Sequence, residues 1–177
     1  MSTIVMPGIG GSGPGHWQTL WEQAAPTLQR FAPSSWDEPD LDDWWRALDR
    51  AVGEGPSLLL AHSLSCLLAV RWAHAHPERV AGMVLVAPPD PAGPSFPASL
   101  AAFTEGLDVR PGVPALIIAS DDDEYCDEER SIALAKQWGI PRVSVGRLGH
   151  INAASGIGDW PEGWRLVEAF KAGLLLA

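Results

Sequence analysis

Residues 57–65 read Ser-Leu-Leu-Leu-Ala-His-Ser-Leu-Ser, and the chain on both sides of this stretch decides the fold. Residues 57–61 carry no charge, which is typical of a central strand in a parallel sheet that is buried on both faces. Residues 64–73 are nearly all apolar too, and the run is long enough for a buried helix. The stretch therefore predicts a buried strand that turns at once into a buried helix, as in α/β folds.

The same alternation of strand and helix extends along the whole chain, with glycines and prolines between the elements. We expect strands over residues 3–6, 28–32, 57–61, 80–87, 114–119 and 142–146. We expect helices over residues 17–25, 41–52 with Asp40 as the N-cap, 64–73, 128–138 and 162–175. This order predicts one α/β domain over residues 1–177, a three-layer sandwich with a mostly parallel sheet of about six strands and helices on both faces.

Length and composition exclude several classes of protein. The chain has 177 residues, 46% of them hydrophobic and 19% charged, which suits one folded domain and not a disordered chain. Its net charge of −10 at pH 7 repels phosphate, so we expect neither nucleic acid nor an anionic membrane as a partner. No run approaches the ~18 apolar residues of a membrane span, and signal-peptide features are missing, so we expect a cytoplasmic protein. Two cysteines, Cys66 and Cys126, are too few for a disulfide framework or a zinc cage, and we expect no metal.

Ser63 stands where the buried strand meets the buried helix. Its position corresponds to the nucleophile elbow G-x-S-x-G, in which a strained turn projects the serine hydroxyl above the sheet. Ala61 and Ser65 replace the two glycines, and both are small enough for the tight turn. The alternative is that Ser63 is only the N-cap of the helix, a position that serine favours.

A serine nucleophile needs a base, and His150 is the best placed of the five histidines. It follows the strand predicted over residues 142–146, at the edge of the sheet where α/β folds place their chemistry. His62 adjoins Ser63, but neighbouring side chains of a strand point to opposite faces, so we expect it to pack inside. His74 and His76 lie at a helix end and are expected to face solvent. The alternative for His150 is an ordinary exposed loop histidine.

An acidic loop follows the strand predicted over residues 114–119 and reads Asp121-Asp122-Asp123-Glu124. A carboxylate is required to orient the histidine and to stabilise its charged form. The order serine, acid, histidine, each after its own strand, is the order found in α/β-hydrolases. Spacing alone leaves open which of these acids is the partner, and the others are expected to be solvated or to cap a helix.

The glycine-rich loop Gly8-Ile9-Gly10-Gly11-Ser12-Gly13 permits two interpretations. It matches G-x-G-x-x-G, the fingerprint of a dinucleotide-binding oxidoreductase, but Pro14 and Gly15 interrupt the helix that the fingerprint requires. The hydrolase interpretation uses the loop to bind an oxyanion, with one backbone N–H from Leu64 and a second from Ile9 or Gly10. We favour the oxyanion hole, and we keep the dinucleotide site as the alternative.

Three longer blocks carry a family resemblance: Ala61-His62-Ser63-Leu64, Ser120-x-x-Asp123-x-Tyr125, and Gly149-His150-Ile151-Asn152-Ala153 with the downstream Trp160-Pro161. With these blocks the chain resembles the small serine hydrolases of the YdeN and retinoblastoma-binding protein 9 type, a compact branch of the α/β-hydrolases. The resemblance implies Ser63 as nucleophile, His150 as base, Asp123 as the acid and no cofactor. Glu124 departs from the proline that often follows this acid in the family.

The expected function is the hydrolysis of a small ester through an acyl-enzyme intermediate. Only residues 88–112 are available to form a lid, enough for a loop and a turn of helix around residues 99–104, so we expect a minimal lid and an open site. His16, Trp17 and Trp160 adjoin the glycine-rich loop or the His150 loop and are candidates for substrate binding, although core packing is the alternative for the tryptophans. A catalytically silent binding protein of the same fold is the second class of function that the sequence permits.

Overall fold

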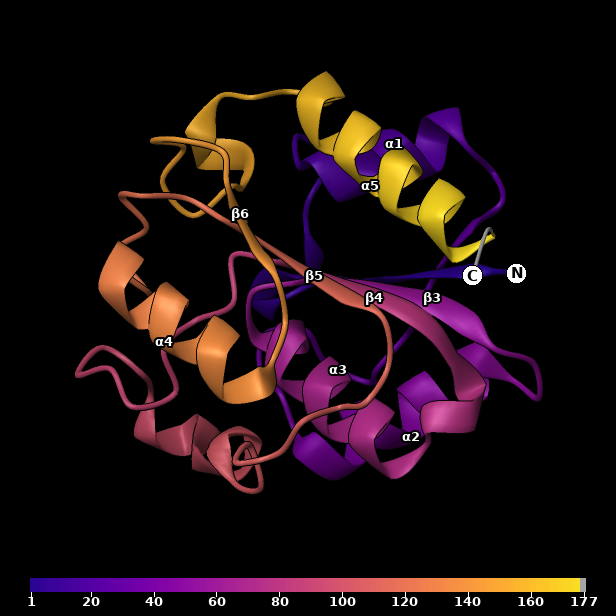
Figure 1. The fold of residues 1–177 in the computed structure, drawn as a ribbon, viewed down its shortest axis with the longest axis horizontal. Helices are drawn as coiled ribbons and strands as arrows, with labels where there is room; N and C mark the ends of the chain where they lie inside the picture. Colours follow the sequence, from indigo (N-terminus) through magenta and orange to yellow (C-terminus); the bar gives the residue numbers. More distant parts are fainter. Residues whose placement is uncertain (176–177) are drawn as a thin grey trace.

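A six-stranded sheet forms the centre of the computed structural model, which describes residues 1–175 (Figure 1). The strands lie in the order β2-β1-β3-β4-β5-β6, and every neighbouring pair is parallel. The strand bounds are β1 Thr3–Met6, β2 Leu28–Arg30, β3 Ser57–His62, β4 Val80–Val86, β5 Ala115–Ala119 and β6 Arg142–Ser144. The expected sheet is confirmed. Because the order reverses between β1 and β3, their carboxyl ends form the switch point at which such folds bind ligands.

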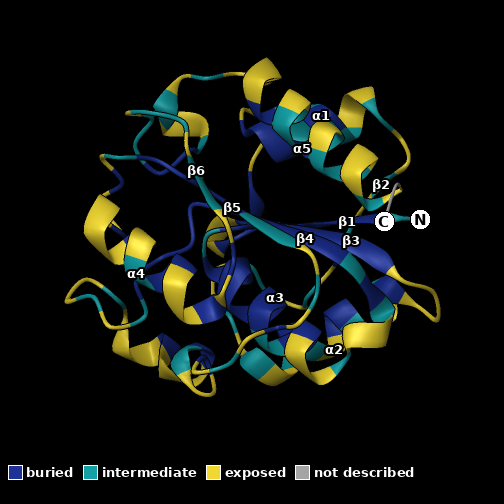
Figure 2. Cartoon of the chain, in the orientation of Figure 1, coloured by how far each residue is buried: buried dark blue, intermediate teal, exposed yellow. Residues whose placement is uncertain are grey.

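Helices cover both faces of this sheet (Figure 1). On one face lie α1 Trp17–Ala24 and α5 Pro161–Leu174. On the other lie α2 Leu41–Val52, α3 Leu64–Ala75 and α4 Glu128–Trp138. Figure 2 shows the buried residues concentrated in the strands, in α3 and on the inward sides of the other helices. Two apolar cores result, one on each face of the sheet, as a three-layer α/β fold requires.

The helix ends follow the local sequence. The Asp40 carboxylate accepts a hydrogen bond from Asp43 N–H at 2.8 Å, which confirms it as the cap of α2. Helix α3 runs two residues past the expected end and stops before Pro77, a residue that has no N–H to continue the helix. Strand β6 ends at Ser144, two residues early, and Gly146 has a φ of 77°, which takes the chain out of the extended conformation.

The connection between β4 and β5 is the short lid region that the sequence anticipated. Its residues Ala98–Thr104 form a 3-10 helix, where the sequence indicated only a loop and a helical turn. Leu100 and Phe103 are buried and hold the segment against the rest of the fold. The connection therefore packs its 3-10 helix against α3 and does not form a separate helical layer.

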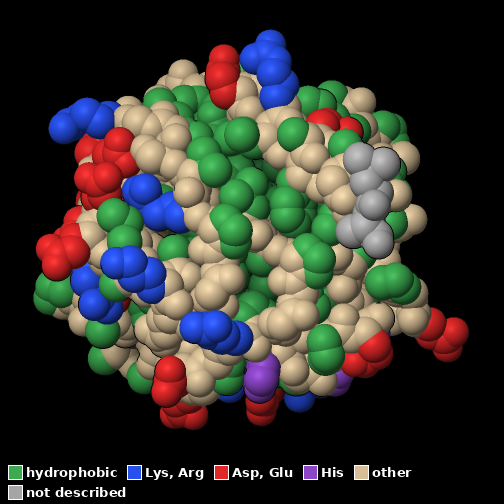
Figure 3. All heavy atoms as spheres, viewed as in Figure 1, with side chains coloured by type: hydrophobic (Ala, Val, Ile, Leu, Met, Phe, Trp, Pro, Cys, Tyr) green, Lys and Arg blue, Asp and Glu red, His purple; other side chains and the backbone are tan. Residues whose placement is uncertain are grey.

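Charged side chains are arranged mainly around the rim of the face seen in Figure 3. Hydrophobic side chains occupy the middle of this face, and acidic and basic side chains are interspersed around it. Within residues 1–175, no helix combines the length and the apolar character needed to cross a membrane.

Candidate active site

The turn at Ser63 holds the backbone in an unusual conformation. Ser63 has a φ of 54° and a ψ of −128°, in a region that residues other than glycine rarely adopt. Its side chain makes no capping hydrogen bond to α3, so the N-cap interpretation fails. The Ser63 hydroxyl instead lies 2.8 Å from Nε2 of His150. The strained turn thus directs the serine toward the histidine and away from its own helix.

His150 connects Ser63 to Asp123. Its Nδ1 lies 2.9 Å from Oδ1 and 2.8 Å from Oδ2 of Asp123, and both side chains are buried. The three residues stand on loops that follow β3, β5 and β6, whose carboxyl ends meet at one edge of the sheet. A hydroxyl, an imidazole and a carboxylate joined in this order can move a proton from the serine and stabilise the resulting imidazolium.

The neighbouring acids have different partners. Asp122 accepts hydrogen bonds from Gly149 N–H at 2.8 Å and from the Ser120 hydroxyl at 2.9 Å. The Gly149 hydrogen bond is the main reason that the pKa of Asp122 lies below its ordinary value. Asp121 accepts from the Ser144 hydroxyl at 2.6 Å. Asp122 therefore ties the His150 loop to the β5 loop, and Asp123 is the acid that faces the imidazole.

The glycine-rich loop lies directly against the serine. A Cβ atom on Gly8 would stand 2.8 Å from the Ser63 Cβ, so only glycine fits there. Within residues 1–175, the N–H groups of Ile9 and Leu64 have no hydrogen-bond acceptor. The N–H of Gly10, the other sequence candidate, donates to Trp36 O at 3.1 Å and is already used. Helix α1 begins only at Trp17, so its N-terminus is not part of the loop as a dinucleotide fingerprint requires.

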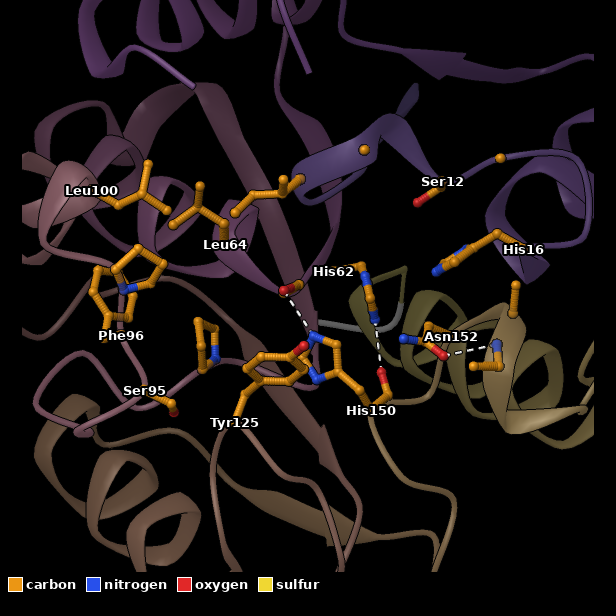
Figure 4. A pocket seen from close by; sticks show the side chains of 18 of the residues that line it. Ser12, His16, His62, Leu64, Ser95, Phe96, Leu100, Tyr125, His150 and Asn152 are labelled. Atoms are coloured by element: carbon orange, nitrogen blue, oxygen red, sulfur yellow. Dashed lines mark hydrogen bonds between the residues drawn. The ribbon is translucent and has the colours of Figure 1, made fainter. Parts of the chain in front are cut away.

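A pocket of about 530 Å³ opens beside Ser63 and His150. Figure 4 shows that its two sides differ in chemistry, with His150 between them and Ser63 hydrogen-bonded to His150. One wall is mainly apolar and consists of Leu64, Pro89, Phe96, Pro97 and Leu100, with Asp90 and Ser95 lining the pocket next to Pro89 and Phe96. The polar wall consists of Ser12, His16, His62 and Asn152. The pocket can therefore receive an extended molecule with one apolar and one polar end.

Two histidines line this pocket besides His150. His62 is the last residue of β3, and His16 immediately precedes α1. His62 is buried, as expected, but it also lines the pocket. Its Nε2 lies 3.0 Å from the backbone oxygen of His150. Burial is the main reason that the pKa of His62 lies well below its ordinary value. His16 is buried too and is the only one of the three substrate-binding candidates that lines the pocket.

The other two candidates, Trp17 and Trp160, belong to the core. Trp17 is 0% exposed and Trp160 is 2% exposed, and neither lines the pocket. The Trp17 indole N–H donates to Ile151 O at 2.9 Å, which supports the loop that carries His150 from below. Trp160 packs over Gly163, where an added Cβ would lie 2.2 Å from the indole ring. Trp17 and Trp160 are close to the site along the chain, but their rings are buried in the core and do not face the pocket.

Several pocket residues carried no functional signal in the sequence. Tyr125 lines the pocket with its ring centroid 4.5 Å from that of His150, and only the family block had marked it. Phe96 and Leu100 come from the lid region, where the sequence gives no reason to select them. Ser65 appeared only as a small residue, yet its hydroxyl donates to Pro7 O at 2.5 Å and ties α3 to the glycine-rich loop.

The Cys66 thiol is structural, and no metal-binding cluster accompanies it among the described residues. Cys66 is fully buried behind Ser63, and burial raises the pKa of its thiol well above the ordinary value. It is a packed thiol with no access to substrate. In the part of the chain that the structure describes, no group of three or more histidine, cysteine or acidic side chains is arranged to hold a metal ion.

Comparisons with known proteins identify the family and the fold of this chain. The sequence profile of the family described as serine hydrolase matches residues 3–169. A crystal structure of a putative YdeN-like hydrolase from Pectobacterium atrosepticum is 32% identical, with 98% of this chain and 91% of that chain covered and a TM-score of 0.86. The product of the ydeN gene of Bacillus subtilis is 22% identical, with 97% and 100% covered and a TM-score of 0.79. Among curated proteins, the search found no match.

A more distant structure shares the fold alone. The ferulic acid complex of Est1E from Butyrivibrio proteoclasticus is 17% identical, with 98% of this chain and 87% of that chain covered and a TM-score of 0.70. The expected α/β-hydrolase fold is thereby confirmed.

Proposed function

This chain belongs to the serine hydrolase family, among the YdeN-like α/β-hydrolases, and from that membership we propose that it hydrolyses a small carboxylic ester. We assign Ser63 as the nucleophile, His150 as the base and Asp123 as the orienting acid. The observation that carries the proposal is the continuous hydrogen-bonded chain from the Ser63 hydroxyl through the His150 ring to the Asp123 carboxylate.

The first half of the reaction forms an acyl-enzyme. The Ser63 oxygen attacks the ester carbonyl carbon while Nε2 of His150 takes the hydroxyl proton. Asp123 stabilises the imidazolium that forms. When the tetrahedral intermediate collapses, the bond to the alcohol oxygen breaks, and His150 returns the proton to that oxygen. The alcohol leaves, and the acyl group remains as an ester of Ser63.

The second half repeats this chemistry with water. His150 removes a proton from a water molecule, whose oxygen attacks the acyl-enzyme carbonyl. Collapse of the second intermediate releases the carboxylic acid, and Ser63 recovers its proton from His150. No cofactor is needed, because proton transfer and the serine oxygen supply the whole chemistry.

The negative charge of each intermediate requires hydrogen-bond donors. We assign the N–H groups of Leu64 and Ile9 to this role, since neither has an acceptor within residues 1–175. Leu64 is also the first residue of α3, where the helix dipole favours negative charge. Gly10, the other loop candidate, is not included because Trp36 already accepts its N–H.

Covalent labelling tests the assignment of Ser63. A fluorophosphonate probe should label the native protein and should fail to label Ser63→Ala, because the phosphorus is attacked by the activated serine oxygen. Hydrolysis of a short p-nitrophenyl ester should fall by at least ~10³-fold in the same variant. Ser99→Ala, at an exposed position outside the pocket, is the matched control and should be labelled normally.

The outcomes separate the enzyme from a silent binding protein. Equal labelling of the native protein and Ser63→Ala would overturn the assignment of the nucleophile. A native protein that neither reacts with the probe nor hydrolyses any ester would favour the binding-protein alternative. Circular dichroism should show the same fold for both variants, since the Ser63 hydroxyl makes no cap to α3.

A further inference from the structure

One imidazole in the pocket has a nitrogen that the protein leaves without a partner. His16 precedes α1 and is only 4% exposed. Its Nδ1 accepts a hydrogen bond from Gln18 N–H at 3.2 Å. Among the described residues, Nε2 of His16 is the one buried side-chain nitrogen or oxygen without a hydrogen-bond partner. His16 lines the pocket, and buried polar atoms are nearly always paired, so an unpaired ring nitrogen next to this pocket indicates a place for a ligand atom.

The bond at Nδ1 determines which nitrogen carries the proton. A ring nitrogen that accepts from a backbone N–H holds its lone pair, so a neutral His16 carries its hydrogen on Nε2. Burial, with smaller effects of Arg30 and His150, lowers the pKa of His16 to about 4, and the ring is therefore neutral near pH 7. Figure 4 shows this ring directed toward the pocket. The unpaired atom is thus an uncharged N–H donor.

The other two imidazoles of the site have no such donor to offer. His62 Nε2 lies 3.0 Å from His150 O, an atom that can only accept, so the hydrogen of a neutral His62 is used there. Both nitrogens of His150 are engaged by Ser63 and Asp123. The ring centroids are 5.0 Å apart between His150 and His62, and 4.7 Å apart between His62 and His16. The three rings therefore form a row that leads from the reacting serine to the donor on His16.

The proposed chemistry decides which half of the ester meets this row. The oxygen of the leaving alcohol takes its proton from Nε2 of His150, so the alcohol must start beside that ring. It can then continue along His62 toward His16. The acyl chain is left with the opposite wall, where Leu64, Phe96 and Leu100 offer apolar contacts and Ser95 is a polar neighbour of Phe96 (Figure 4).

We propose that the pocket selects esters with an apolar acyl chain and an alcohol that carries a hydrogen-bond acceptor, such as an ether, hydroxyl or carbonyl oxygen, which binds the Nε2–H of His16. This inference rests on the proposed hydrolysis at Ser63. It makes His16 a residue that determines specificity without taking part in bond making or breaking.

Pairs of isosteric esters test the proposal. 2-Methoxyethyl butanoate and butyl butanoate have the same acyl group and differ by one ether oxygen in place of a methylene. 3-Methoxypropyl and pentyl butanoate form a second pair, with the oxygen one atom further out. Ethyl 3-methoxypropanoate and ethyl pentanoate place the oxygen in the acyl half. The measured quantity is the ratio of kcat/KM within each pair, which is independent of the total activity of a preparation.

Two substitutions of His16 separate its two nitrogens. His16→Asn keeps an oxygen that can accept from Gln18 N–H and cap α1, but it removes the donor at Nε2. His16→Gln places an amide N–H near the former Nε2 position. In at least one alcohol pair, the preference of the native enzyme for the ether should fall about three- to tenfold in His16→Asn and persist in His16→Gln. His74→Asn, at the exposed end of α3, is the control and should keep the native ratio.

Three outcomes would count against the proposal. An unchanged ratio in His16→Asn for both alcohol pairs would overturn it, and a change confined to the acyl pair would overturn the assignment of the polar wall to the alcohol. Fluorophosphonate labelling of Ser63 in the same preparations distinguishes these failures from a failure of the proposed function. Labelled enzyme with unchanged ratios rejects only the role of His16, whereas unlabelled, inactive native protein rejects both.

Discussion

Gly8 is the residue on which the position of Ser63 depends most directly. Its backbone has a φ of −80°, which alanine also adopts, so a substitution there would cause steric contact and no backbone strain. The added Cβ would meet the Ser63 Cβ at 2.8 Å and the Ser63 Oγ at 3.3 Å. The serine or the loop would have to move.

We therefore expect Gly8→Ala to lower kcat/KM by about 10²-fold, because a displacement of ~1 Å has this effect on a positioned nucleophile. Ester hydrolysis and the rate of fluorophosphonate labelling are the measurements. Gly55→Ala is the matched control, since its Cβ would enter open space. A labelling rate in Gly8→Ala equal to that of the native protein would show that the glycine-rich loop can shift without cost. The close approach of Gly8 to Ser63 would then have no effect on activity.

The sequence alone identified individual catalytic candidates only where the order of strands and polar residues along the chain distinguishes them. Ser63 and His150 were predicted because each follows its own strand, in the order that this fold uses. Asp123 was chosen by family resemblance alone, since three adjacent aspartates are equivalent until the turn directs one of them to His150. For Trp17 and Trp160 the structure supports core packing, the other role that the sequence permitted, and not substrate binding. The sequence could not decide between these roles, because the direction of a side chain depends on packing between distant segments.

At the scale of elements, Ser65 joins α3 to the loop that follows β1, near the switch point of the sheet. Its buried hydroxyl donates to Pro7 O, and this hydrogen bond connects the first turn of α3 to the loop after β1. The elbow motif has glycine at this position. In this chain the serine therefore adds a link that the motif itself does not contain.

Replacing Ser65 by the glycine of the elbow motif should destabilise the protein. We expect Ser65→Gly to lower the free energy of unfolding by about 1–2 kcal/mol, from the lost hydrogen bond and the greater backbone freedom of glycine. Ser65→Ala separates the two causes and should lose only about 1 kcal/mol. Urea denaturation with an unchanged m-value is the measurement. A glycine variant as stable as the native protein would mean that the bond to Pro7 contributes nothing.

Element positions were predictable to a larger extent than residue roles. Apolar runs and helical periodicity placed all six strands and five helices, because burial in a layered fold imposes these patterns on the sequence. Where the predicted and observed ends differed, they differed by one or two residues. One such place is the end of β6, where the positive φ of Gly146 takes the chain out of the extended conformation. The 3-10 helix of the lid region was only partly anticipated, since its contacts are made with distant segments.

At the scale of the whole molecule, buried histidines connect the site to the stability of the fold. His16 has a pKa of about 4 in the folded protein, because of burial first and of Arg30 and His150 next. In the unfolded chain a histidine titrates near ~6.5. As the pH falls from 6.5 to 4, the unfolded state takes up a proton that folded His16 does not, so the free energy of unfolding falls over this interval.

Comparison of two pH profiles should isolate this effect. The free energy of unfolding of the native protein should decrease more steeply between pH 6.5 and 4.5 than that of His16→Asn, with a difference on the order of 2–3 kcal/mol. Chemical denaturation at several pH values is the measurement, and His62, Arg30 and His150, which act on the His16 ring, stay unchanged in both proteins. Parallel profiles would contradict the burial of a neutral His16.

The apolar wall of the pocket stands largely on one stretch of chain, since Pro89, Phe96, Pro97 and Leu100 all lie between β4 and β5. None of the three proposed reacting side chains is on that stretch. Under the proposed assignment, preference for the acyl group and cleavage of the ester bond are encoded by separate segments of the gene. Grafting the connection between β4 and β5 from a relative is then a direct route to engineered variants that accept esters of longer or bulkier acids.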